Sequence, residues 1–212
     1  MLFARQKAAK ALPSTRTFAV NEKAVKNRMK SVQSIVKITR AMKLVAASKM
    51  NKDVARLLNG KNFGHGSIDT VFKSDTYMQR KAPHESAAPR DLLVPLTTDR
   101  GLCGGINSNI VREIKQYVAQ GNRANIKIFA IGEKGPGALV RPFPDLLNEA
   151  VSELALPMNY ATVMAVASKI DLFSQNDDRI IIFYNEFQSM ITYVIRKMEL
   201  MPRKRFLETI KY

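Results

Sequence analysis

Residues 22–58 lie in the longest stretch of the sequence that contains neither glycine nor proline. Apolar residues recur there three and four positions apart, a spacing that keeps them on one side of a helix. We predict a single helix, which at about 1.5 Å per residue would be roughly 55 Å long. A helix of this length is typical of a coiled coil. The predicted coiled-coil seam consists of Val25, Met29, Val32, Val36, Val45, Met50, Val54 and Leu57.

The same stretch is strongly basic, and no acidic residue stands between Lys23 and Lys52. These charges exclude a membrane span. The chain has a net charge of +16, and +12 of it lies in the first 60 residues. Such asymmetry favours an element that faces an acidic partner over a uniformly basic nucleic-acid binder. A basic coiled coil that binds nucleic acid remains the alternative, although no aromatic residue interleaves with the basic ones.

Four segments flank or follow this helix. Residues 1–20 are basic, alanine-rich and free of acids, which is typical of a mitochondrial presequence, with a basic arm as the alternative. Residues 59–90 contain several glycines and prolines and are predicted to be a linker. A compact domain is expected over residues 91–202, and a basic tail over 203–212. The single cysteine excludes an internal disulfide, so a reducing compartment is the default.

The compact domain alternates strands and helices, which predicts an α/β fold with a mostly parallel sheet. Pro95 lies inside the first strand, where it predicts a bulge or an early end, because proline cannot donate a ladder hydrogen bond. Residues 132–144 are predicted to be a Gly/Pro-rich connection, and 145–156 is left undecided. The last two strands are separated only by Gln188 and Ser189 and should form an antiparallel edge hairpin. The predicted strands and helices are strand 91–98, helix 107–119, strand 125–131, helix 161–173, and strands 179–187 and 190–200.

A glycine-rich turn joins the first strand to the first helix of this domain, where nucleotide folds bind phosphate. Its glycines do not have the G-x-G-x-x-G spacing, and no acidic residue follows the second strand to hold a ribose. A structural turn is therefore favoured over a nucleotide-binding enzyme, the remaining alternative. The turn residues singled out are Asp99, Arg100, Gly101, Cys103 and Gly104.

No catalytic constellation is evident in the sequence. His65 and His84 are isolated, so we expect no metal site, and no cofactor is expected. Cys103 has no histidine partner in sequence and is interpreted as a small buried residue at a tight turn. Asp99 and Arg100 could pair with each other, cap the following helix or contact another subunit.

Three segments carry a resemblance to a known family. The runs Lys30–Gln33 and Lys37–Met50 resemble the N-terminal helix of the γ subunits of F-type ATP synthases. The turn Thr98–Asn107 resembles that family's Asp-Arg-Gly-Leu-Cys-Gly turn. The resemblance extends from about residue 21 to residue 200.

The resemblance implies a central rotor stalk without an active site, in which the long helix pairs with a C-terminal helix and a Rossmann-like domain forms the foot. It implies the α and β subunits of the catalytic hexamer, the δ and ε subunits and the membrane rotor ring as partners, and no nucleic acid. It also implies a location on the matrix side of the mitochondrial inner membrane. The residues that would face the acidic levers of the β subunits are Lys37, Thr39, Arg40, Met42 and Lys43.

Two features depart from the family pattern. Pro95 stands where the family's first strand has a small or β-branched residue, so this strand is expected to be distorted. The family's long C-terminal helix is absent after the hairpin. We therefore expect an incomplete chain, whose seam is covered by a γ helix supplied in cis or in trans.

Overall fold

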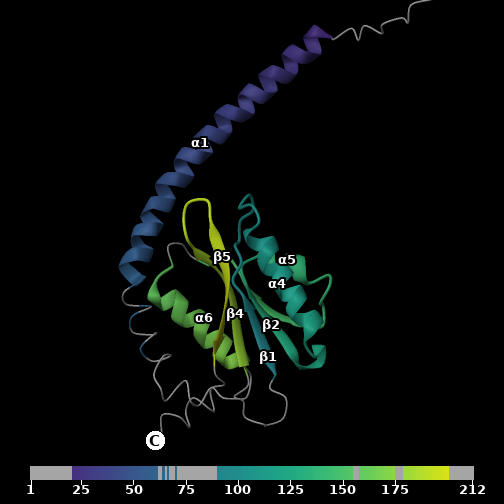
Figure 1. Cartoon of the computed structure of the whole chain (residues 1–212), viewed down its shortest axis with the longest axis vertical. Coiled ribbons are helices and arrows are strands. Elements are labelled where there is room, and N and C mark those ends of the chain that lie inside the picture. Colours follow the sequence, from purple (N-terminus) through teal and green to yellow (C-terminus); the bar gives the residue numbers. More distant parts are fainter. Residues whose placement is uncertain are drawn as a thin grey trace, which may run out of the picture. The chain divides into compact units, whose positions relative to one another are not determined.

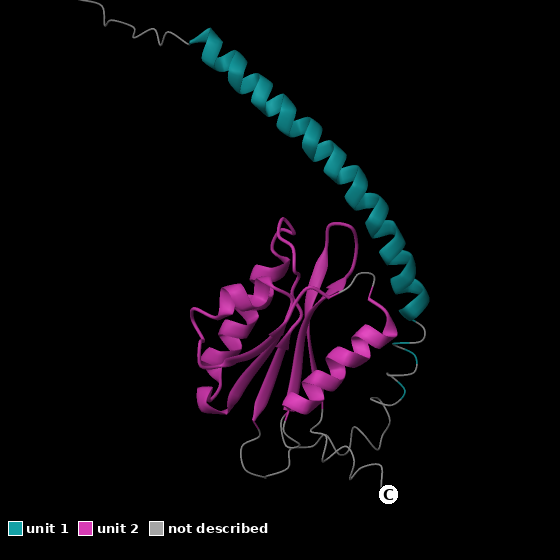
Figure 2. Cartoon of the chain, turned by 180° about the vertical axis from the view of Figure 1, so that it is seen from behind, with its two compact units in different colours: residues 1–70 teal, residues 71–212 magenta. Residues whose placement is uncertain are grey.

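The computed structural model describes residues 21–61, 64, 66, 70, 90–154, 158–174 and 179–200. The chain divides into two compact units, residues 1–70 and 71–212, coloured separately in Figure 2. The predicted presequence, most of the predicted linker with His65 and His84, and the predicted basic tail lie outside the described residues.

Unit 1 contains helix α1, Glu22–Lys61, which has 40 residues and is therefore about 60 Å long. The side chain of Asn21 caps it by accepting a hydrogen bond from the backbone N–H of Ala24 at 3.2 Å. Glu22 in the first turn and Lys61 in the last complement the helix dipole. The predicted long helix is confirmed, and it continues beyond residue 58 and through Gly60. No residue of α1 is buried.

Unit 2 is a five-stranded sheet in the order β3-β2-β1-β4-β5. The first four strands run parallel, and β5 pairs antiparallel with β4. Figures 1 and 2 show α4 and α5 on one face of this sheet and α6 on the other. The mixed α/β fold with an antiparallel edge hairpin is thus as predicted. The strands are β1 Asp91–Pro95, β2 Ile126–Ile131, β3 Leu147–Val151, β4 Arg179–Phe187 and β5 Tyr193–Leu200, and the helices are α4 Ile106–Gln120, η2 Arg123–Asn125, α5 Lys134–Leu139 and α6 Tyr160–Phe173.

The hydrophobic core occupies both faces of the sheet, because successive side chains of a strand point to opposite faces. Leu93 of β1 belongs to a cluster with residues of α4 and α5, such as Ile114 and Leu139. Its neighbours Leu92 and Val94 belong to a second cluster, against which α6 packs. Burial on both faces explains why β1 is apolar from Leu92 to Pro95 and why β2 is apolar except at the half-buried Lys127.

Pro95 ends β1 early, as predicted. The pairing of β1 with β4 continues to Pro95 opposite Phe183, whereas its pairing with β2 stops at Leu93 and resumes only at a bridge from Leu96 to Ile131. The N–H of Leu96 donates to β4 and the N–H of Thr97 donates to β2. Donors alternate along a strand, so residue 95 would have donated towards β2. Proline has no N–H, and the ladder is interrupted on that side.

The segment 132–144, predicted to be a Gly/Pro-rich connection, contains helix α5, which the sequence analysis did not predict. Gly135 lies in the first turn of this helix, where its absent side chain permits close packing. A Cβ atom there would lie 2.7 Å from the Oγ1 of Thr97. Pro136 is tolerated because first-turn N–H groups lack helical partners.

Two further boundaries differ from the expectation. The undecided segment 145–156 contains strand β3 at the sheet edge. The hairpin turn is longer than two residues, since β5 begins at Tyr193 rather than at Met190. The N–H groups of Gln188 and Ser189 both donate to the carbonyl of Thr192, which closes the wider turn.

Among the described helices, none combines the length and apolar character needed to cross a membrane.

Candidate functional site

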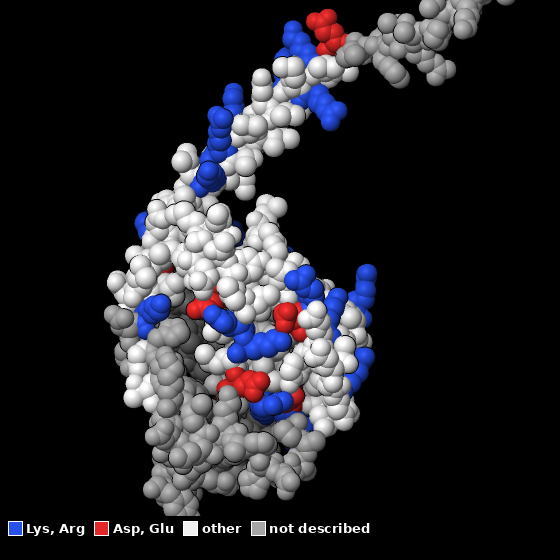
Figure 3. Space-filling model, in the orientation of Figure 1, with Lys and Arg blue, Asp and Glu red and all other residues white. Residues whose placement is uncertain are grey.

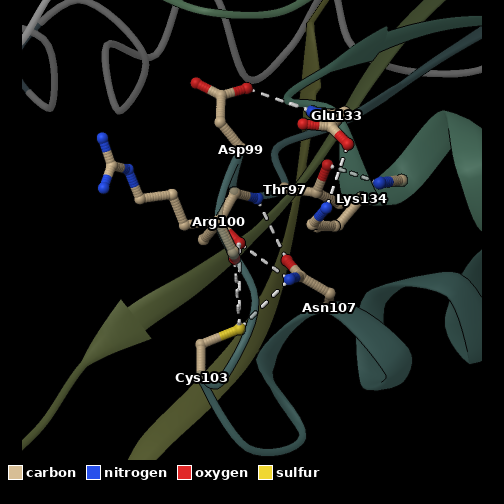
Figure 4. A network of polar contacts seen from close by, with 9 residues as sticks. Thr97, Asp99, Arg100, Cys103, Asn107, Glu133 and Lys134 are labelled. Carbon is tan, nitrogen blue, oxygen red and sulfur yellow. Dashed lines mark hydrogen bonds and ion pairs between the residues drawn. The ribbon is translucent and has the colours of Figure 1, made fainter.

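The turn after β1 is held closed by Asn107 in the first turn of α4 (Figure 4). The Oδ1 atom of Asn107 accepts from the backbone N–H of Thr98 at 3.0 Å. Its Nδ2 atom donates to the Oγ1 of Thr98 at 2.7 Å and to the Sγ of Cys103 at 3.1 Å. One amide therefore joins the start of the turn, its middle and the helix that follows. Sequence reasoning missed this role, which an asparagine directly after a glycine-rich turn could have indicated.

Cys103 takes part in this network as a half-buried free thiol. Its Sγ lies 3.7 Å from the Oγ1 of Thr98 and 3.9 Å from the carbonyl oxygen of Arg100. Within the described residues, no cluster of metal-ligating side chains is found. The thiol fills the turn and accepts a hydrogen bond there, which supports a structural role, but Cys103 is half-buried and not buried as predicted.

Asp99 ties the turn to the neighbouring connection, a role that the sequence did not indicate. Its carboxylate accepts from the backbone N–H of Glu133 at 3.1 Å. Helix α4 begins after Gly105 without a side-chain cap, so Asp99 does not cap the following helix. The Arg100 side chain extends away from the network in Figure 4.

The glycines of the turn have different requirements. Gly104 has φ +64°, a conformation that glycine adopts without strain. Leu102 has φ +60° and is 96% exposed. A Cβ at Gly101 would meet no atom within 4 Å, so packing does not require this glycine.

We expect Asn107→Ala to lower the free energy of unfolding by about 2 kcal/mol, because the part-buried groups of Thr98 and Cys103 lose their partner. The matched control is Ser108→Ala. The Ser108 hydroxyl makes one exposed hydrogen bond to the carbonyl of Gly105 at 3.3 Å, so its loss should cost less than about 0.5 kcal/mol. Urea unfolding of both variants measures the difference. Equal effects would contradict the role assigned to Asn107.

The second candidate site is the surface of α1, which carries the residues expected to contact the β subunits. Lys37, Arg40 and Lys43 are exposed, and Figure 3 shows Lys and Arg side chains spaced along the visible side of the helix. The Thr39 hydroxyl donates to the carbonyl of Ile35 within the same helix at 2.8 Å. At about 100° per residue, Met42 lies about 140° from Lys37 around the helix axis. The five residues therefore surround the helix and do not share one face.

The coiled-coil seam remains a prediction, and the rotation of α1 sets one of its positions apart from the others. Most of its members fall within an arc of about 80°, but Val45 follows Val36 by nine residues and lies about 180° away. Lys43, seven residues after Val36, takes the place of an apolar residue on the seam line. On this geometry we propose a seam without Val45. The seam residues are Val25, Met29, Val32, Val36, Met50, Val54 and Leu57.

Val45 instead belongs to a second apolar surface, which we call the middle patch. It lies on the side of α1 away from the seam residues. Its four side chains are between 54% and 61% exposed. The apolar residues of this patch were visible in the sequence. A spacing of three or four does not show whether such residues form one stripe along the helix or two stripes on different sides. The middle patch consists of Ile35, Ile38, Met42 and Val45.

Comparison with known proteins agrees with the fold. A family model described as ATP synthase matches residues 21–211. The mitochondrial ATP synthase subunit gamma of Drosophila melanogaster is 32% identical over 172 residues, covering 81% of this chain and 56% of that protein. A chain of the Tetrahymena thermophila mitochondrial ATP synthase central stalk and c-ring is 42% identical, with a TM-score of 0.72, covering 82% of this chain and 77% of that one.

This chain belongs to the ATP synthase γ-subunit family. The resemblance seen in the sequence is thereby confirmed, and neither the nucleic-acid nor the nucleotide-enzyme alternative finds support. A Euglena gracilis mitochondrial ATP synthase rotor chain, 19% identical with a TM-score of 0.64 over 88% of this chain and 64% of that one, shares the fold. The γ-family chain spans 56% of the Drosophila relative and 52% of the Ipomoea batatas relative.

Proposed function

We propose that this γ-family chain forms part of the central rotor stalk of the mitochondrial ATP synthase, on the matrix side of the inner membrane. It would transmit torque between the membrane rotor ring and the catalytic hexamer of α and β subunits, with the δ and ε subunits beside its foot. In this role the chain catalyses no reaction itself. Cleavage of the presequence, with a mature protein that begins near Ala19, remains a prediction.

The charge distribution of α1 carries this proposal. A helix of 40 residues without one buried side chain has basic groups around its whole circumference and no acid from Lys23 to Lys52. Contacts between exposed charges are weak and screened by salt. Such contacts form and break readily, which suits a shaft that meets several equivalent acidic partners in turn.

The two apolar surfaces of α1 would contact different partners. The seam residues run along both ends of the helix and suit a second stalk helix, from this or another polypeptide, in a coiled coil. The middle patch lies on another side, where that helix cannot cover it at the same time. We propose that the middle patch, with the basic residues beside it, contacts the acidic levers of the β subunits.

Photocrosslinking in the purified ATP synthase tests this division. A photoreactive amino acid replaces Val32 on the seam or Ile38 in the middle patch. We expect the seam position to crosslink to the second stalk helix and the middle-patch position to crosslink to β subunits. A single product shared by both positions would contradict the division of surfaces. Absence of the chain from the purified complex would contradict the rotor function itself.

A further inference from the structure

The polypeptide reaches and leaves the sheet of unit 2 at the same end of its strands. It reaches the sheet at Asp91, the first residue of β1, and leaves it at Leu200, the last residue of β5. Asp91 is paired with Arg179, and Leu200 is paired with Ile180. Only the first residues of β4 therefore separate the two points at which the polypeptide connects to the sheet.

Arg179 lies between these two connections and contacts both. Its Nε donates to the Oδ1 of Asp91 at 2.9 Å and its Nη2 to the Oδ2 at 3.1 Å, a bidentate pair. Its Nη1 lies 3.9 Å from a carboxylate oxygen of Glu199 in β5. Its backbone N–H also donates to the carbonyl of Arg90 at 2.8 Å.

Tyr117 of α4 completes the arrangement. Its hydroxyl donates to the Oδ2 of Asp91 at 2.7 Å and accepts from the Nη2 of Arg179 at 3.1 Å. Its ring packs edge-on against Phe183 in the core, with the ring centroids 6.0 Å apart. Burial, followed by the hydrogen bond to Asp91, raises the pKa of Tyr117 to about 12. The phenol therefore keeps its proton and donates at neutral pH.

The direction in which the strands are pulled determines which of these contacts bears the load first. When two strands are pulled apart from the same end, their hydrogen bonds break one after another, beginning at the pulled end. Resistance then depends on the contacts at that end, and forced unfolding follows the rate of this first rupture. The bidentate pair joins β1 to β4 at the first pair of the ladder, and Glu199 extends the contact to β5.

We propose that Arg179 is a clamp. It resists separation of β1, β4 and β5 at this end of the strands when torque passes between the two connections of unit 2. The edge clamp consists of Asp91, Tyr117, Arg179 and Glu199. The role of the edge clamp under torque rests on the proposed rotor function. Its resistance to pulling is a property of the isolated chain and does not depend on that function.

Optical-tweezers unfolding of the full chain along two axes tests the clamp, in a Cys103→Ser background. The first axis pulls through Pro89→Cys and Met201→Cys, which directly precede Arg90 and directly follow Leu200 in the sequence. The second pulls through Gly101→Cys and Ser189→Cys, in the turns at the opposite end of the strands. We expect Arg179→Gln to raise the unfolding rate at fixed force about tenfold on the first axis and less than about twofold on the second.

Two further variants distinguish a clamp from a contribution to general stability. Arg179→Lys keeps the charge but loses the bidentate fork, so its effect on the first axis should be intermediate. Arg196→Gln removes a 2.7 Å ion pair with Glu186 from the same strand pair, nearer the hairpin turn, and should leave the first axis unchanged. Equal acceleration on both axes by Arg179→Gln, or none on the first, would overturn the clamp. Either result is independent of whether the chain assembles into an ATP synthase.

Discussion

Gly132→Ala should lower the free energy of unfolding of unit 2 by more than about 3 kcal/mol. Gly132 has φ +89°, and a Cβ there would lie 2.2 Å from the carbonyl oxygen of Thr97. That backbone cannot retreat, because the N–H of Thr97 donates to the carbonyl of Ile131 at 2.8 Å. The N–H of Gly132 also donates to the carbonyl of Val151 in β3. The substitution therefore separates the ends of three neighbouring strands.

The matched control is Gly137→Ala, in the exposed part of α5. A Cβ at Gly137 would meet no atom within 4 Å. Alanine is favoured over glycine in a helix by up to about 1 kcal/mol, so this variant should be neutral or slightly more stable. Thermal unfolding followed by circular dichroism measures both, and Gly132→Ala should melt about 10 °C lower or more. A similar melting temperature for the two variants would contradict the close approach of residues 97 and 132.

Val32→Asp should reduce incorporation of the chain into the stalk by about a hundredfold. Val32 lies on the seam and is half exposed in this chain, but in a coiled coil it would be covered by the second helix. Burying an unpaired carboxylate costs several kcal/mol, far more than its attraction to exposed basic groups returns.

The control Ala55→Asp introduces the same charge at an exposed position, about 120° around the helix from the seam line and about 15 Å along the helix from the middle patch. An aspartate there stays in water or meets other chains, so incorporation should change less than about threefold. The measurement is the fraction of each variant that co-purifies with the β subunits when it competes with the unmodified chain. Equal loss from both substitutions would indicate a general charge effect and would contradict the seam.

The sequence was most informative where a signal was local and repeated. The long spacing pattern from Val25 to Leu57 predicted α1, and the apolar runs predicted β1, β2 and β4. Pro95 acted as the sequence predicted, because the loss of an N–H depends only on residue chemistry.

The sequence was least informative where distant segments meet. Glycines in α5 appeared to be helix breakers, although Gly135 packs against Thr97, 38 residues earlier. Asp99 bonds to Glu133 across 34 residues, a partner that spacing cannot reveal. Val45 was placed in the seam because the pattern of three and four was followed without counting the cumulative rotation around the helix.

Hydrogen exchange over residues 32–50 tests most directly the claim that α1 is a stalk helix waiting for a partner. Most helical stability comes from packing an apolar face against other groups, and none of α1 is buried in this chain. We expect these amides to exchange rapidly in the isolated chain and at least about a hundredfold more slowly in the assembled ATP synthase. Slow exchange in the isolated monomer would show that the chain covers α1 by itself, and would contradict the stalk assignment.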